Sequence, residues 1–305
     1  MQNKWCTIAP VNSNYSDTNN CLKNPIIFSN AVVLAKTPKW FKEFSTDKDL
    51  GLHDRLLIES AEYVICKEYQ ASNLGDPDPE WKGPESRTIQ KAMLEQIQRV
   101  NLALWVAKPT CIGFSLVIDA MYGESKWFLM EPKRIDGLVP HNIYKNASLT
   151  EEDIEEAKSM CKSLCKLNSG SVWQACVSLH WALTTKNWDH RYLNLWIALE
   201  SLFGPDDPKE ITYRMSQRIA FFLAENRAEA RNVFELAKKG YKWRSKIVHG
   251  RSLDSLDAQD SEQMLFAAED LIRRSLNQIL DDTKLIKKFN SHNRESYLDN
   301  LVFSA

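Results

Sequence analysis

The spacing of apolar residues changes near the middle of the chain. In the second half, apolar positions recur every three or four residues, which predicts helices over 172–185, 190–203, 211–223, 227–240 and 257–281, with a short helix ending at His249. No segment in this half alternates between polar and apolar residues as a half-buried strand does. We therefore expect the second half to be an up-and-down helical bundle.

The first half mixes the helical and the strand periods. Residues 89–106 carry a helical stripe that ends before Pro109, whereas 26–36, 111–120 and 126–130 are typical of strands. The segment 56–69 fits neither template. Residues 1–25 are rich in Asn, Ser, Thr and Asp, and we expect a loose arm or a short edge strand there.

A helix and a polar break mark the predicted domain boundary. Thr150 followed by Asp153 resembles a capping box, and apolar residues at Ile154, Ala157, Cys161 and Leu164 continue as one helical stripe. The residues Asn-Ser-Gly-Ser at 168–171 then interrupt the pattern. The sequence therefore predicts an α+β N-terminal domain over 1–168, with a sensory or regulatory role, followed by an all-α helical bundle over 169–305.

Composition excludes several classes of protein. With 305 residues, 44% hydrophobic and 26% charged, the chain is not a disordered, collagenous or coiled-coil rod protein. Its formal net charge of −1 means that any nucleic-acid surface must be local. No apolar run is long enough to span a bilayer and no signal peptide is evident. An odd count of seven cysteines favours free thiols, so we expect a cytoplasmic protein that contacts no membrane.

Two cysteines lie four residues apart on a predicted helix. Cys161 and Cys165 could in principle bind a metal, but no second Cys or His pair lies nearby to complete four ligands. Packing in the core is the favoured interpretation, and we predict neither a metal nor a cofactor.

Two charged residues interrupt apolar stripes in the second half. Glu200 falls on the stripe formed by Leu193, Trp196, Ile197 and Phe203, and Arg218 lies on or beside the stripe of the next helix. Burying a charge costs several kcal/mol unless it is paired. We therefore expect Glu200 to face Arg218 or another arginine inside the bundle, either as a structural ion pair or to position an active-site arginine.

The segment 241–252, YKWRSKIVHGRS, combines basic residues with a helix end. Gly250 suits the position just after a helix, which places His249 at the C-terminus, where the negative end of the helix dipole favours a protonated imidazole. Arg244 lies five residues earlier and is long enough to reach the same anion, and Ser245 shares the face of His249. Residues 227–251 hold eight basic and two acidic side chains, a local charge of +6, although a solvated basic face is the ordinary explanation for such a run.

These motifs together resemble a known family. The segment LNLWIALESLFG at 193–204, Arg218 within YRMSQRIAFFL, and YKWRSKIVHG at 241–250 are similar to a HEPN domain, in particular the ApeA-like branch of prokaryotic defence proteins. The mark of that family, R-x4–6-H, is here Arg244-x4-His249. Ser245 departs from the pattern, because family members often carry Asn, Asp or His there. The resemblance covers roughly residues 171–282.

The resemblance implies a metal-independent endoribonuclease, with tRNA a plausible substrate. The 2′-hydroxyl of RNA would attack the adjacent phosphate while His249 acts as general base or acid and Arg244 holds the phosphate. It also implies a homodimer through the helical bundle that joins two motifs in one cleft, and an antiphage or toxin system with a phage-derived trigger at the N-terminal domain. By position, the catalytic residues are Arg244 and His249, the supporting residues are Glu200, Arg218 and Ser245, and the RNA-binding residues are Lys242, Lys246 and Arg251.

Two other interpretations stay open. The chain could hold a non-catalytic HEPN module that binds RNA, nucleotide or a partner protein, which the departure at Ser245 favours. Alternatively, Glu200, Arg218 and Arg244 could form one ion network in a purely structural scaffold.

Overall fold

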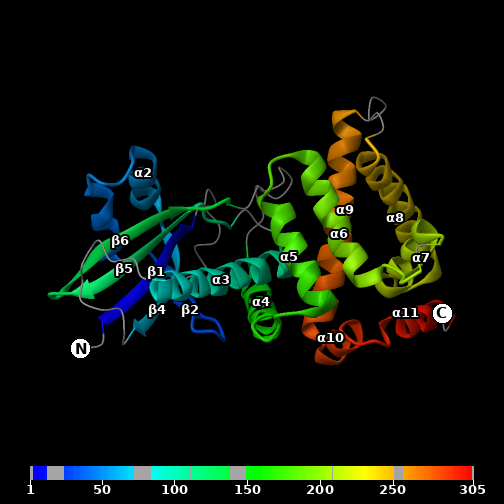
Figure 1. Cartoon of the computed structure of the whole chain (residues 1–305), viewed down its shortest axis with the longest axis horizontal. Coiled ribbons are helices and arrows are strands. Elements are labelled where there is room, and N and C mark those ends of the chain that lie inside the picture. The colour runs from blue at the N-terminus through cyan, green and yellow to red at the C-terminus, as the bar shows by residue number, and fades with distance from the viewer. Residues whose placement is uncertain are drawn as a thin grey trace. The chain divides into compact units, whose positions relative to one another are not determined.

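The computed structural model describes residues 3–11, 24–71, 84–109, 112–137, 149–207, 209–250 and 257–303. The chain divides into two compact units, Met1–Cys165 and Lys166–Ala305 (Figure 1). The first holds an antiparallel sheet with helices and the second is helical. The predicted fold class, an α+β region followed by an all-α region, is confirmed.

The N-terminal unit is built on six antiparallel strands in the order β2-β3-β4-β1-β5-β6. Their bounds are β1 Asn3–Val11, β2 Ile26–Ile27, β3 Val33–Lys36, β4 Tyr63–Ala71, β5 Leu116–Gly123 and β6 Lys126–Arg134. β5 and β6 form a hairpin whose two loop residues, Glu124 and Ser125, have positive φ angles of 50° and 66°. Positive φ at both central residues is the type I′ geometry that matches the twist of a two-residue hairpin.

The expectation for residues 1–25 was wrong for the part that forms β1. This strand lies between β4 and β5 in the middle of the sheet, and Cys6 and Ile8 are buried. Side chains on both faces of β1 are buried: Trp5, Thr7 and Ala9 on one face, and Cys6 and Ile8 on the other. The strand therefore lacks the solvent-facing polar side that an edge strand would show.

Five helical segments accompany the sheet among the described residues of this unit. They are α1 Lys39–Glu43, η2 Phe44–Thr46, α2 Leu52–Ser60, α3 Pro84–Ala107 and α4 Glu151–Leu164. Phe41, Phe44 and Ile58 pack on the sheet face that carries Cys6 and Ile8. The ambiguous segment 56–69 contains the end of α2 and most of β4, which explains why neither period fitted it. The capping box at Thr150 is confirmed, with both reciprocal hydrogen bonds to Asp153 present.

The C-terminal unit consists of helices that pack around α6. Their bounds are α5 Gly170–Thr184, α6 Trp188–Phe203, α7 Ile211–Leu223, α8 Arg227–Val248, α9 Ala258–Asp281, α10 Thr283–Phe289 and α11 Arg294–Phe303. α6 contacts α5, α7, α8 and α9. The predicted bounds of α7 agree with the structure, whereas α10 and α11 lie beyond the last predicted helix.

The predicted break at Gly240 is absent, and α8 is one helix of 22 residues. Gly240 is buried against α6: a Cβ at this position would lie 2.4 Å from Cζ2 of Trp196, and the Tyr192 hydroxyl donates to the Gly240 carbonyl at 2.8 Å. Glycine therefore stands here because two helices approach closely, not because the helix ends.

Candidate functional site

The last turns of α8 bring Arg244 to the side of α6. Arg244 Nη2 lies 2.9 Å from Oε1 and 3.0 Å from Oε2 of Glu200, and each side chain is 23% exposed. The sequence predicted that Glu200 faces Arg218 or another arginine, and the structure shows that its partner is Arg244 and not Arg218. The pair lies at the margin of the core, where water reaches both groups.

The Arg244 guanidinium also packs against the face of an aromatic ring. Its central carbon lies 5.4 Å from the centroid of the Tyr241 ring, which in turn packs edge-on against Trp196 at 5.5 Å. Burial, together with the charge and hydrogen bonding of Glu200, raises the pKa of Tyr241 to about 12. The tyrosine therefore stays neutral and supports the cation through its ring face.

Glu200 uses only part of the guanidinium. A single nitrogen, Nη2, reaches both carboxylate oxygens, so the pair is not the two-nitrogen fork that arginine can form. Nε of Arg244 is buried and has no hydrogen-bond partner among the described residues. Glu200 orients the arginine through Nη2, and the buried Nε is closed to a ligand from solution, so Nη1 is the donor left for a second acceptor.

His249 lies at the C-terminal end of α8, as predicted. It is the C-cap residue, its backbone N–H donates to the Ser245 carbonyl at 3.1 Å, and its side chain is exposed. Gly250 follows with a φ of +59° and donates to the Ile247 carbonyl at 3.0 Å, which confirms the expected glycine after the helix. Within the described parts of the chain, no hydrogen bond or ion pair joins the His249 side chain to Arg244.

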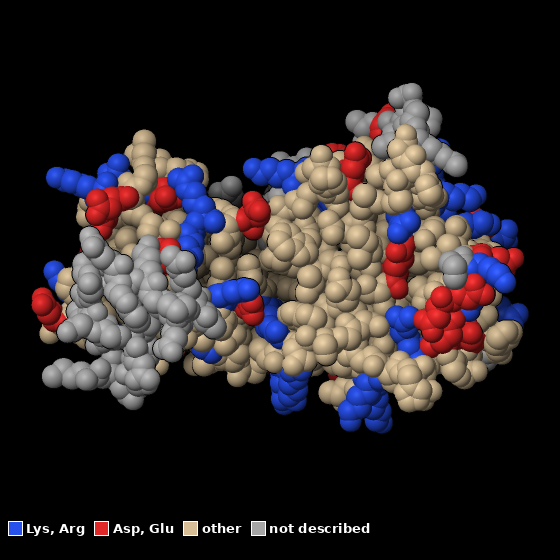
Figure 2. Space-filling model, in the orientation of Figure 1, with Lys and Arg blue, Asp and Glu red and all other residues tan. Residues whose placement is uncertain are grey.

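The remaining predicted residues fall into three environments. Lys242 is exposed, Ser245 is half-buried, and Lys246 places its ammonium 3.9 Å from the centroid of the Trp243 ring. Arg251 lies outside the described residues. Figure 2 shows Lys and Arg side chains along the edge of the helical unit where α8 lies.

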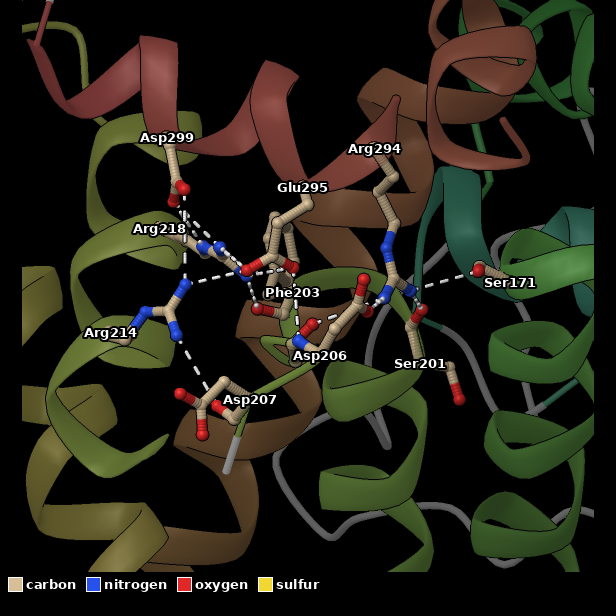
Figure 3. A network of polar contacts seen from close by, with 11 residues as sticks. Ser171, Ser201, Phe203, Asp206, Asp207, Arg214, Arg218, Arg294, Glu295 and Asp299 are labelled. Carbon is tan, nitrogen blue, oxygen red and sulfur yellow. Dashed lines mark hydrogen bonds and ion pairs between the residues drawn. The ribbon is translucent and has the colours of Figure 1, made fainter. Parts of the chain in front are cut away.

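Arg218 belongs to a different cluster, which joins α11 to α7 (Figure 3). It is 1% exposed, donates to the Phe203 carbonyl at 3.2 Å, and contacts Glu295 and Asp299 at 2.7 Å each. Arg214 reaches the same Glu295 oxygen at 2.7 Å. Glu200, Arg218 and Arg244 therefore do not form one ion network. Arg218 instead holds α11 against α7.

A third cation in this cluster ties the end of α6 to the start of α11. Arg294 donates to the Ser201 carbonyl at 2.7 Å and to the Ser171 hydroxyl at 3.1 Å, and it lies 3.2 Å from Asp206 (Figure 3). Sequence reasoning missed the members of this cluster on α11, because that helix has no clear apolar stripe to reveal it.

Sequence reasoning also misplaced the buried face of α6. Ile197 of the predicted stripe is 39% exposed, and the buried face instead carries Arg191, which is 5% exposed. Arg191 pairs with Glu269 of α9 at 2.6 Å, and Glu269 is fully buried. The sequence held a sign of this face, because Arg191 lies four residues before the apolar Leu195 and residues at this spacing share one side of a helix.

The N-terminal unit holds two further polar clusters. Thr7 donates to Asp119 at 2.6 Å and Lys133 contacts the same carboxylate at 3.1 Å, while burial raises the pKa of Asp119. Cys161 is buried and its sulfur lies 3.9 Å from that of the exposed Cys165. No group of three or more potential metal ligands occurs within the described residues.

The chain matches no family model, no curated protein and no solved structure. Among the helices in the described parts of the chain, none combines the length and apolar character that crossing a bilayer requires.

The arrangement at the end of α8 suits anion binding. The oriented guanidinium of Arg244 and the exposed imidazole of His249 lie five residues apart on one helix, about 7.5 Å along its axis at 1.5 Å per residue. Arginine matches the geometry of phosphate oxygens, and imidazole exchanges protons near neutral pH. Together the two residue types can bind an oxyanion and exchange a proton with it.

Proposed function

We propose that the C-terminal unit is an endoribonuclease that cuts RNA without a metal, with Arg244 and His249 as its catalytic residues. The observation that carries this proposal is the Glu200–Arg244 pair, which orients a partly free guanidinium beside the helix end that carries an exposed histidine. The resemblance of these segments to a HEPN domain supports the same assignment. It also supports a role in prokaryotic antiphage defence or as a toxin, with the N-terminal unit sensing a phage-derived trigger.

The reaction needs only groups that RNA and this chain supply. The 2′-oxygen attacks the phosphorus as a general base takes its proton, the bond from phosphorus to the 5′-oxygen breaks, and a general acid protonates that oxygen. The products are a 2′,3′-cyclic phosphate and a 5′-hydroxyl. Arg244 would hold the phosphate oxygens and stabilise the charge that develops on them.

A second copy of the chain would complete the site. One histidine does not readily act as base and acid at opposite ends of the same displacement, so we propose a homodimer in which each copy contributes His249 to one cleft. Lys242, Lys246 and Arg251 would contact flanking phosphates, which makes binding weaken as salt rises.

The test is cleavage of tRNA or another structured RNA by the purified full chain in EDTA. We expect cleavage by the wild type, with products ending in a cyclic phosphate, and a loss of at least 100-fold in His249→Ala and in Arg244→Ala. His190→Ala, which changes an exposed histidine on α6, is the matched control and should cleave as the wild type does. Equal activity in wild type and both variants would overturn the proposal.

A non-catalytic RNA-binding or partner-binding module is the second candidate, and one contact favours it. Glu200 neutralises Arg244, which lowers the attraction of this site for a phosphate and so favours the partner-binding form of this candidate over catalysis. Under this candidate, expression of the wild type is no more toxic to cells than expression of His249→Ala. A clear difference in toxicity between these two chains supports the nuclease.

A further inference from the structure

A groove between α7 and α8 lies away from the Arg244 site. It has a volume of about 370 Å³, within the range of small-ligand sites. Its walls include Tyr213, Gln217 and Phe221 from α7 and Arg227, Arg231 and Phe234 from α8.

Aromatic rings form one side of this groove. Tyr213 is 50% exposed, and its ring packs edge-on against Phe234 with centroids 5.3 Å apart. Lys238 places its ammonium 5.2 Å from the centroid of the Phe234 ring. An aromatic side chain half open to water offers a face on which a flat ring can stack.

Cations without acidic partners form the other side. Arg227 and Arg231 are exposed, one turn apart on α8, and neither makes an ion pair with any described residue. The acidic residues of this stretch lie elsewhere: Glu229 is bound to Arg274 at 2.8 Å, and Glu235 does not line the groove. The groove is therefore net positive and complementary to a polyanion.

The position of the groove relates it to the proposed cleavage site. Arg231 and His249 are 18 residues apart, which at 100° per residue is a whole number of turns, so both lie on one side of α8. The separation along the axis is about 27 Å. The groove and His249 therefore share one side of α8, whereas Arg244, 13 residues from Arg231, lies about 140° away around the helix.

We propose that the groove between α7 and α8 binds a single-stranded segment of RNA, with a base stacked on Tyr213 and phosphates held by Arg227 and Arg231. Stacking faces interleaved with cations are the arrangement that holds single strands without reading their sequence. The choice of RNA as the occupant rests on the proposed function, whereas the binding itself does not require cleavage.

The test measures binding of a fluorescent 12-nucleotide 2′-O-methyl oligouridine by anisotropy, with the full chain. This probe lacks the 2′-hydroxyl, so it reports binding whether or not the chain is a nuclease. We expect Arg227→Glu/Arg231→Glu to raise Kd at least tenfold and Tyr213→Leu to raise it about fivefold or more. In Arg227→Gln/Arg231→Gln, the slope of log Kd against log salt should flatten by about 1.4, since each phosphate contact on a single strand contributes about 0.7.

The matched control is Lys284→Glu/Lys287→Glu, which reverses two exposed charges on α10. Its Kd should equal that of the wild type, in contrast to the Kd of Arg227→Glu/Arg231→Glu. Wild-type affinity in the arginine variants overturns the inference. So does unchanged affinity in Tyr213→Leu combined with full competition by polyglutamate, because the groove is then only an anionic-polymer patch. If these variants lose binding as expected but the wild type does not cleave RNA, the proposed nuclease is contradicted and the groove assignment is retained.

Discussion

Arg244 of α8 and Glu200 of α6 are joined by one guanidinium nitrogen that lies 2.9 and 3.0 Å from the two carboxylate oxygens. This geometry links the helix that ends at His249 to the central helix of the C-terminal unit. An ion pair that water still reaches contributes about 1 kcal/mol or less to folding, yet it can determine where a catalytic arginine points, so the pair can matter more for function than for stability.

Glu200→Gln is expected to reduce RNA cleavage at least tenfold while lowering the free energy of unfolding by less than about 1 kcal/mol. The amide keeps the size of the side chain but no longer holds the cation by charge. Urea unfolding and cleavage rates measured on the same preparation check both parts. Glu262→Gln, at an exposed position of α9, serves as the control. A fall in stability that matches the fall in cleavage would show that the pair is only structural.

The cluster between α7 and α11 is expected to make the C-terminal unit sensitive to acid. Burial acts to raise the pKa of Glu295, but hydrogen bonds from Arg218 and from the backbone of Asp206, with the charges of Arg218 and Arg214, outweigh it and hold the pKa below the ordinary 4.5. A lowered folded-state pKa contributes stability above the unfolded value, and that stability is lost as pH falls through the folded pKa.

Glu295→Gln should therefore lower the thermal midpoint at pH 7 and show a smaller further decrease between pH 5 and pH 3 than the wild type does. Thermal melts at these pH values provide the measurement. Arg218→Met is the companion variant: it should destabilise by about 3 kcal/mol, because it leaves Glu295 and Asp299 without their buried cation. Identical acid profiles in wild type and Glu295→Gln would refute the assignment.

Gly240→Ala should destabilise the C-terminal unit by about 1–3 kcal/mol, although alanine favours helices intrinsically. The added methyl would lie 2.4 Å from Cζ2 of Trp196, so α6 and α8 must move apart. Asn232→Ala, at an exposed position of the same helix, should be neutral or stabilising. Chemical denaturation of the two variants distinguishes close packing from helix propensity.

Because Arg191 and Glu269 form a buried ion pair, substitutions of the two residues are expected to have strongly coupled effects on the free energy of unfolding. Glu269→Met alone leaves a buried guanidinium unpaired and is expected to cost about 3–5 kcal/mol, whereas Arg191→Met/Glu269→Met should recover most of that loss. A double-mutant cycle on the free energy of unfolding measures this coupling. Additive losses in the double variant would contradict it.

Local pattern was sufficient for much of the fold. Helical spacing predicted α7 with its bounds, the capping residues predicted the start of α4, and Gly250 predicted the end of α8 at His249. These features depend on residues within a few positions of one another, which is why a sequence read without a structure reveals them.

Other features depended on residues distant in sequence. β1 is central because β4 and β5 pair with its two edges, and α8 continues through Gly240 because Trp196 packs against that glycine. Neither partner is encoded near the residue that it affects. α11 has no apolar stripe, and its ion pairs with α7 become visible only when both helices are in place.

By itself, the sequence determined the fold class, the helical character of the second half, and the candidate pair Arg244 and His249. Only the tertiary structure decided that Glu200 faces Arg244, that Arg218 pairs with acidic residues of α11, and that Arg191 and Glu269 are the buried pair. The physical reason is that helical periodicity fixes the angle at which a side chain projects around the helix axis. The identity of its partner depends on how neighbouring helices pack.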